Sequence, residues 1–233
     1  MNLVEGNLFL ILIAVICYIL GSIPVAYVVT KVVTGKDVRR SGSGNIGAMN
    51  TYRVIRAERS TGLAIAGFVI ALLGDLGKGV LAVFVARWLD FLNYDLTSAL
   101  IVSSFFVVLG HNYCLFFRFK QGGRGLSSMG GVVLALNPLA FLVGLGVLIL
   151  SIILAQYLLV GRINWGRFSE VFSVIGSQIV GRVIGLAVAL VPIYFFGLEV
   201  FLPALAAMHL VWIRHVGRVR AYIRDLRASG GRN

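Results

Sequence analysis

The sequence is poor in cysteine, in histidine and in acidic residues. It contains 2 cysteines, 3 histidines and 9 acidic residues in a chain of 233 residues. Cys17 and Cys114 are far apart, in apolar segments without metal-ligating neighbours, so we expect buried free thiols rather than a disulfide or a thiolate metal site. His111, His209 and His215 lack carboxylate or thiolate partners at ligand spacing. The sequence therefore predicts no bound metal and no cofactor.

Charge of either sign is also scarce. Charged residues make up 13% of the chain and hydrophobic residues 59%, and the mean hydropathy is +0.94. A soluble core cannot bury so much apolar surface, which excludes an ordinary soluble globular protein. The sequence predicts an all-α polytopic membrane protein with one integral membrane domain over residues 1–233. The first apolar run, 8–30, is too long for a signal-peptide core, so we expect it to stay in the mature protein.

Apolar runs that can cross a bilayer recur along the chain. Asn137 and Pro138 divide one of them, because proline lacks a backbone donor and disfavours helix in the residue before it. Each half then runs part or all of the way across the membrane. This count gives about seven predicted transmembrane helices, some short or broken: 8–30, 62–86, 97–117, 125–136, 138–157, 171–196 and 198–213.

The net charge of +12 is concentrated between and after these runs, in 31–59, 118–124 and 214–232. Loops rich in lysine and arginine stay on the cytoplasmic side, so these segments, with their glycine-rich loops, are predicted to be cytoplasmic. Seven crossings also bring the C-terminus inside. The basic clusters flank membrane spans and lack regularly interleaved aromatic residues. Membrane lipids, and not nucleic acid, are therefore the predicted partners.

Residues 41–50, SGSGNIGAMN, form a polar, glycine-rich loop between two apolar runs. Small residues let the backbone approach a ligand, and their unpaired N–H groups can converge on an oxyanion. Arg39, Arg40 and Arg53 supply positive charge nearby. The pattern indicates either a phosphate site at the membrane surface or a simple turn between helices.

Other polar groups are expected on the same side of the membrane. Asp75 and Lys78 lie one helical step apart within a span and form either a structural or a catalytic pair. His111 approaches the cytoplasmic end of the run 97–117. Residues 122–125, GGRG, open the next segment, either as a second anion site or as a plain helix start.

Several of these motifs resemble the signatures of one family. SGSGNIGAMNTYR at 41–53 resembles GSGNxGAxNxxR, DLGKG at 75–79 resembles D-x-x-K-G, and GHNYCLFFRFKQGGRG at 110–125 resembles GH…FxxFKGGKG. These patterns are typical of the bacterial acyl-phosphate-dependent glycerol-3-phosphate acyltransferases, the PlsY family. Weaker matches are Arg167-Phe168 followed by Ser173, and Arg214-His215.

The resemblance implies an enzyme of the cell inner membrane, with its active site and C-terminus in the cytoplasm. It implies acyl transfer from acyl phosphate to the sn-1 hydroxyl of glycerol 3-phosphate, giving lysophosphatidate and phosphate. The expected catalytic residues are Ser43, Arg124 and His215. The expected substrate-binding residues are Gly42, Gly44, Asn45, Asn50, Arg53, Lys78, His111, Lys120, Gly122, Gly123 and Ser173.

The sequence also lacks the usual devices for covalent acyl transfer. It has no G-x-S-x-G motif, and the residues five after His111 and His215 are Phe116 and Arg220, which excludes an H-x-x-x-x-D pair. Cys114 follows His111 by three residues, but an apolar span favours the neutral thiol. Acyl phosphate is an activated mixed anhydride. We therefore expect direct transfer without an acyl-enzyme, driven by alignment of two anionic substrates and neutralisation of charge.

The motifs depart from the family pattern at several positions. Arg124 replaces a lysine, Gln121 adds a residue to its loop, and Arg218 stands where the family has asparagine. These changes leave open a different polyol phosphate as acceptor, or another acyl donor. A small polytopic transporter or lipid-binding protein is the non-enzymatic alternative, since Asp75 and Lys78 could line an ion path. No internal repeat supports a transporter.

Overall fold

The computed structural model describes residues 3–90, 95–161, 163, 165 and 168–230. Within these, the side chains of 3–5, 89–90, 168–169, 173 and 225–230 are not described. The described chain is helical. Its elements are α1 (Leu3–Ser22), α2 (Val25–Thr34), the short η1 (Val38–Arg40), α3 (Ala48–Glu58), α4 (Thr61–Asp90), α5 (Leu96–Asn112), η2 (Leu115–Phe117), α6 (Leu126–Leu136), α7 (Pro138–Leu159), α8 (Phe168–Ser177), α9 (Ile179–Tyr194) and α10 (Leu198–Gly230).

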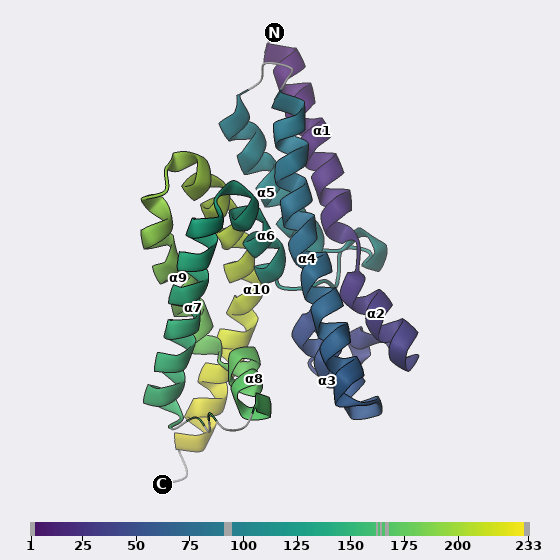
Figure 1. Ribbon diagram of the computed structural model, residues 1–233, viewed down its shortest axis with the longest axis vertical. Helices are drawn as coiled ribbons and strands as arrows, with labels where there is room; N and C mark the ends of the chain where they lie inside the picture. Colours follow the sequence, from purple (N-terminus) through teal and green to yellow (C-terminus); the bar gives the residue numbers. More distant parts are fainter. Residues whose placement is uncertain (1–2, 91–94, 162, 164, 166–167, 231–233) are drawn as a thin grey trace.

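The long helices form two groups that run side by side along the long axis (Figure 1). One group contains α1, α4 and α5, and the other contains α7, α9 and α10, with α6 between them. Contacts of α10 with α5, and of α6 with α4, join the groups. Helices α2, α3 and α8 gather at the end of the molecule where α10 ends, and α1 begins at the opposite end (Figure 1).

Glycines allow the closest helix contacts. A Cβ on Gly21 of α1 would lie 2.1 Å from the Val107 carbonyl oxygen of α5, and one on Gly110 of α5 would lie 2.1 Å from the Tyr18 carbonyl oxygen of α1. The same reciprocal fit joins Gly79 of α4 to α6. Small residues at helix contacts are the usual means of packing in lipid, where apolar side chains gain little by leaving the hydrocarbon.

The membrane class predicted from composition is confirmed. Among the residues that the structure describes, five stretches are long and apolar enough to cross a bilayer: Gly6–Thr34, Thr61–Trp88, Leu96–Phe117, Pro138–Leu159 and Leu198–Arg224. The bent pair α8 and α9 makes a sixth, and α6 is a shorter apolar helix. With 11 residues, α6 rises only about 17 Å, against a hydrocarbon core of about 30 Å. Seven is therefore an approximate count, with α6 as a partial crossing.

The break at Asn137 and Pro138 is confirmed. Asn137 has an extended backbone, and its side chain caps α7 by accepting a hydrogen bond from the Ala140 N–H. The predicted span 8–30 lies within the single stretch Gly6–Thr34, although the helix is divided there into α1 and α2 at Pro24, whose missing N–H interrupts the helical ladder. Two other boundaries were wrong. The predicted span 171–196 bends by 66° between α8 and α9, at Gln178, which has an extended backbone. The last predicted span, 198–213, was too short, because α10 continues past the apolar run.

Candidate active site

The glycine-rich loop is shaped by a buried asparagine. Asn50, at 1% exposure, accepts a hydrogen bond from the Ser43 backbone N–H (2.8 Å) and donates two, to the carbonyls of Val38 (3.1 Å) and Ser41 (3.0 Å). Gly42 has φ +60°, and a Cβ there would lie 2.3 Å from Asn50 Oδ1. Both donors of the Asn50 amide are thus used to hold the loop in a conformation that favours glycine.

This arrangement removes three N–H groups of the loop from those that were expected to be free for an oxyanion. The Ser43 N–H is bound to Asn50, and the Gly44 and Gly47 N–H groups are bound to the carbonyls of Ser41 and Asn45. The loop satisfies these groups internally because it folds back on itself. What it presents to the cavity are the side chains of Ser43 and Asn45 and the first residues of α3.

The loop is also braced by a charged pair. Asp37 caps η1 by accepting from the Arg39 backbone N–H (2.9 Å), and the Arg39 guanidinium donates to the same carboxylate. These hydrogen bonds hold the pKa of Asp37 below its usual value. The guanidinium also stacks over the rings of Tyr27 and Phe117. Arg39 therefore stabilises the loop and is not free to bind phosphate.

The second glycine-rich turn is packed against the end of α5. A Cβ on Gly122 would lie 2.3 Å from the Asn112 carbonyl oxygen, and one on Gly123 would lie 1.8 Å from His111 Nε2. The Gly123 N–H donates to the His111 carbonyl oxygen (2.9 Å), and Arg214 donates to the carbonyls of Gly122 and Gly123. These glycines do not line the main cavity. The turn instead places Arg124, which does, just before α6.

Arg124 carries an electrostatic penalty in this position. Its pKa is lowered to about 9, first because it is buried, and then because Arg218, Arg182, Arg214 and Arg53 lie near it. This pKa still lies above neutral pH, so the Arg124 guanidinium stays charged there. The turn thus holds a cation among other cations, an arrangement that an anion would relieve.

The Asp75–Lys78 pair is confirmed as a contact and includes a histidine. Lys78 Nζ lies 2.7 Å from Asp75 Oδ1, and His111 Nδ1 lies 3.5 Å from the same oxygen. All three side chains are buried. Asp75 and His111 reach the main cavity, whereas Lys78 lines a separate small pocket of about 10 Å³. Lys78 is therefore engaged with Asp75 and does not line the main cavity.

His215 lines the cavity and has a buried ring nitrogen without a partner among the described residues. The residue is 1% exposed, and its Nδ1 lies 2.8 Å from the Val211 carbonyl oxygen. Because a carbonyl can only accept, Nδ1 carries the proton, and Nε2 offers a lone pair. Within the described part of the chain Nε2 has no hydrogen-bond partner, and His215 lines the main cavity.

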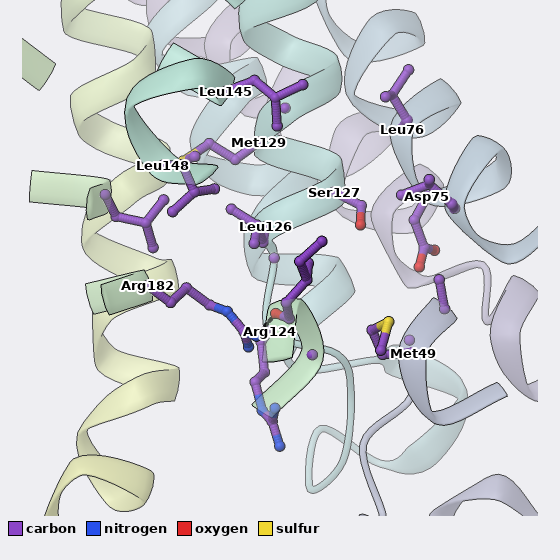
Figure 2. A pocket seen from close by; sticks show the side chains of 18 of the residues that line it. Met49, Asp75, Leu76, Arg124, Leu126, Ser127, Met129, Leu145, Leu148 and Arg182 are labelled. Carbon is purple, nitrogen blue, oxygen red and sulfur yellow. Dashed lines mark hydrogen bonds between the residues drawn. The ribbon is translucent and has the colours of Figure 1, made fainter. Parts of the chain in front are cut away.

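The main cavity has a volume of about 470 Å³. Ser43, Asn45, Arg53, Arg124 and His215 contribute to its polar lining. Its apolar part is formed by side chains of α6, α7, α9 and α10. Figure 2 shows Arg124 and Arg182 together in one region, with Leu145, Leu148 and Met129 beyond them. A cationic region joined to an apolar one suits an amphiphile with an anionic headgroup.

The structure brings together 7 of the 14 predicted site residues at one cavity. Those that line the main cavity are Ser43, Asn45, Asn50, Arg53, His111, Arg124 and His215. Those that do not are Gly42, Gly44, Lys78, Lys120, Gly122 and Gly123. Lys120 is exposed on its loop. Ser173 lies in α8, and its side chain is outside the described part of the structure.

One cavity residue was missed in the sequence. Arg182 of α9 is 8% exposed and lines the cavity. It is the only charged residue in the helix IVGRVIGLAVALVPIY. A lone cation in an apolar span is a signal of function, and this signal was available before the structure.

Comparison with known proteins decides the family. The model of the family described as glycerol-3-phosphate acyltransferase matches residues 11–225. The chain belongs to the glycerol-3-phosphate acyltransferase family. It is therefore an enzyme, and the transporter and lipid-binding alternatives are set aside.

Members of the glycerol-3-phosphate acyltransferase family resemble the chain over much of its length. The glycerol-3-phosphate acyltransferase of Clostridioides difficile (strain 630) is 32% identical over 185 residues, covering 79% of this chain and 86% of that protein. Glycerol-3-phosphate acyltransferase 2 of Moorella thermoacetica is 39% identical over 153 residues, covering 64% and 70%.

Two crystal structures share the fold. They are the glycerol 3-phosphate and lysophosphatidic acid forms of PlsY (YgiH), an integral membrane glycerol 3-phosphate acyltransferase. Their TM-scores are 0.68 and 0.67, at 24% and 23% identity, and each comparison covers 93% of this chain and 92% of the other. The likeness supports the membrane fold of this acyltransferase.

Proposed function

We propose that this acyltransferase uses acyl phosphate as donor and transfers the acyl group directly to the sn-1 hydroxyl of glycerol 3-phosphate. The products are lysophosphatidate and inorganic phosphate. The observation that carries the proposal is the single cavity that joins an apolar region to Arg53, Arg124 and Arg182. Two phosphate-bearing substrates together bring several negative charges, which matches three arginines that pair with no carboxylate among the described residues.

Direct transfer is supported by the state of the nucleophile candidates. The Cys114 thiol donates to the Ser22 carbonyl and does not line the main cavity, and Cys17 is fully buried. Ser43 lines the cavity, but no hydrogen bond between its hydroxyl and a histidine is found among the described residues. Among the described residues, neither cysteine nor Ser43 is thus activated by a neighbouring base.

In the proposed reaction the glycerol 3-phosphate hydroxyl oxygen attacks the acyl carbonyl carbon. His215 Nε2 accepts a hydrogen bond from the hydroxyl and orients it. The new C–O ester bond forms, the bond from the carbonyl carbon to the phosphate oxygen breaks, and the leaving phosphate takes the hydroxyl proton. Alignment of the two reactants lowers the activation barrier by about 7 to 11 kcal/mol. Arg124, as a cationic donor to the developing charge, stabilises the transition state by about 3 to 4 kcal/mol.

We also propose that the site and the C-terminus face the cytoplasm, as the basic segments do. Exposed cations are Lys31 on α2, Arg56 on α3, and Arg220 and Arg224 on α10. These parts of the helices gather at one end of the molecule (Figure 1). Arginine and lysine at that end favour the cytoplasmic side and contact with anionic membrane lipids.

The donor is tested with purified protein in detergent. Glycerol 3-phosphate is offered with palmitoyl phosphate, palmitoyl-CoA or palmitoyl carrier protein, and lysophosphatidate is measured. We expect product only from palmitoyl phosphate. Product from either thioester would contradict the proposed donor, and an acyl adduct trapped on Ser43, Cys114 or Ser173 during turnover would contradict direct transfer.

A further inference from the structure

Arg182 begins an otherwise apolar stripe on α9. Arg182, Leu186, Ala189 and Ile193 recur at helical spacing, and all four line the main cavity. The rotation of α9 is fixed from behind, because Cβ atoms on Gly181 and Gly185 would lie within 3 Å of Ser151 or Ile152 of α7. Glycine packing against α7 therefore turns Arg182 towards the cavity.

The Arg182 guanidinium has little to satisfy it in the protein. Its Nη2 donates to the Ile175 carbonyl oxygen of α8 (2.5 Å). No carboxylate pairs with it within the described residues. Asp75, an acid that lines the same cavity, is engaged by Lys78 and His111. A guanidinium has five donors, and a buried charge without a counter-ion is unfavourable, so the site fits an anion.

The position of Arg182 distinguishes the two substrates. From Arg182 the apolar stripe extends about 17 Å along α9 to Ile193. A fatty acyl chain lying on this stripe would place its attached headgroup beside Arg182. Arg53 of α3 reaches the neighbouring residue of α8: its Nη2 would lie 3.1 Å from a Cβ on Gly176, next to the Ile175 carbonyl that binds Arg182. The apolar stripe on α9, and not distance from Arg53, is what assigns Arg182 to the acyl chain. The acyl donor is therefore the substrate whose phosphate comes nearest to Arg182.

We propose that Arg182 binds the phosphate of the acyl donor and selects an acyl chain with an anionic headgroup. This inference rests on the proposed function and names a specificity residue for it. Arg124 faces the same region from the start of α6, so the two arginines hold the donor phosphate between them (Figure 2). A neutral headgroup would leave both cations without a partner, which disfavours it.

A purely structural role for Arg182 gives a different expectation. Its bond to the Ile175 carbonyl joins the start of α9 to α8. If Arg182 served only to make that bond, its substitution would lower thermal stability and kcat without changing KM for one substrate more than for the other. The test therefore separates KM for the donor from KM for the acceptor.

The variants are Arg182→Met, which keeps the apolar stem, and Arg182→Lys, which keeps the charge but loses the planar fork. The matched control is Arg56→Met, because Arg56 is exposed on α3 and does not line the cavity. KM is measured for palmitoyl phosphate at saturating glycerol 3-phosphate, and for glycerol 3-phosphate at saturating palmitoyl phosphate.

In Arg182→Met, loss of a charge-assisted bond should raise KM for palmitoyl phosphate by about 10-fold to 100-fold. KM for glycerol 3-phosphate should stay close to that of Arg56→Met, and Arg182→Lys should recover part of the loss. An unchanged donor KM, or a larger rise for the acceptor, would overturn the inference.

A second measurement is independent of turnover. Dodecyl phosphate, which cannot donate an acyl group, is titrated into the wild type, Arg182→Lys and Arg56→Met, with binding read from the thermal midpoint. We expect weaker binding only in Arg182→Lys, so the readout holds even where the Met variant does not fold. Equal binding by all three would refute the role of Arg182. Failure of the wild type to use palmitoyl phosphate, with dodecyl phosphate still bound through Arg182, would reject the proposed function alone.

Discussion

Replacing Asn50 tests whether the hydrogen bonds of its buried amide, and not bound substrate, hold the glycine-rich loop in its conformation. Asn50→Ala removes three hydrogen bonds from a side chain that is 1% exposed. At about 1 kcal/mol for each bond the loss is about 3 kcal/mol, which corresponds to a fall of about 6 to 12 °C in the thermal midpoint.

Asn50→Asp sharpens the test. The aspartate keeps an acceptor for the Ser43 N–H but turns an oxygen towards the carbonyls of Val38 and Ser41. Because buried acceptors then face each other, the nearly isosteric Asp should destabilise the protein more than Ala does. The control is Asn45→Ala, since Asn45 lines the cavity without a side-chain hydrogen bond among the described residues.

The assay is thermal unfolding in detergent, followed by lysophosphatidate production well below the midpoint. Both Asn50 variants should melt earlier, and both should lose affinity for substrate because the loop no longer presents Ser43. Asn45→Ala should lower activity at an unchanged midpoint. If Asn50→Asp melts with the wild type, the loop is not held by the Asn50 amide, and our interpretation of Asn50 as a shaping residue fails.

Two further predictions concern the second turn and its arginine. Arg124→Met should lower lysophosphatidate production by about 100-fold to 1000-fold through loss of a cationic donor. The unliganded variant should melt no earlier than the wild type, because a buried charge that other arginines repel is removed. The Arg124 pKa of about 9 leaves the guanidinium charged at pH 6 to 8, so the difference in midpoint should not change across that range. An earlier midpoint would show that Arg124 stabilises the fold. Gly123→Ala should displace the His111 ring, whose Nε2 would lie 1.8 Å from the new Cβ, and lower kcat by about 100-fold. Gly77→Ala, with nothing within 4 Å, is its control, and equal activities of the two variants would show that the turn tolerates the shift.

Composition was enough to predict the membrane class, and Asn137 and Pro138 were enough to predict the break between two helices. The resemblance to the acyltransferase family predicted that Ser43, Arg124 and His215 share one site, and all three line one cavity. The first two features depend on local chemistry, since apolar runs report contact with lipid, and Pro138 begins a new helix that the Asn137 side chain caps. The pairing of Asp75 with Lys78 follows from their spacing for the same reason.

The rest depends on contacts between distant segments. Hydropathy does not distinguish one straight span from two helices with an apolar joint, so the bend at Gln178 was missed. The use of the Ser43 N–H by Asn50 requires the loop to fold back onto α3, which no local pattern specifies. The direction in which Arg182 points is set by glycine packing between α9 and α7. Its charge within an apolar run could have been noticed, but not its place in the cavity.

The reciprocal fit of Gly21 and Gly110 ties the lipid-facing helix α1 to the chemistry of the pocket. Gly110 immediately precedes His111, so the backbone contact with α1 fixes how α5 is rotated at the residue that reaches Asp75. An added methyl group at Gly21 or Gly110 would separate α1 from α5 and move the His111 imidazole away from Asp75. The packing of α1, which does not line the main cavity, thus determines the position of the His111 side chain, which does.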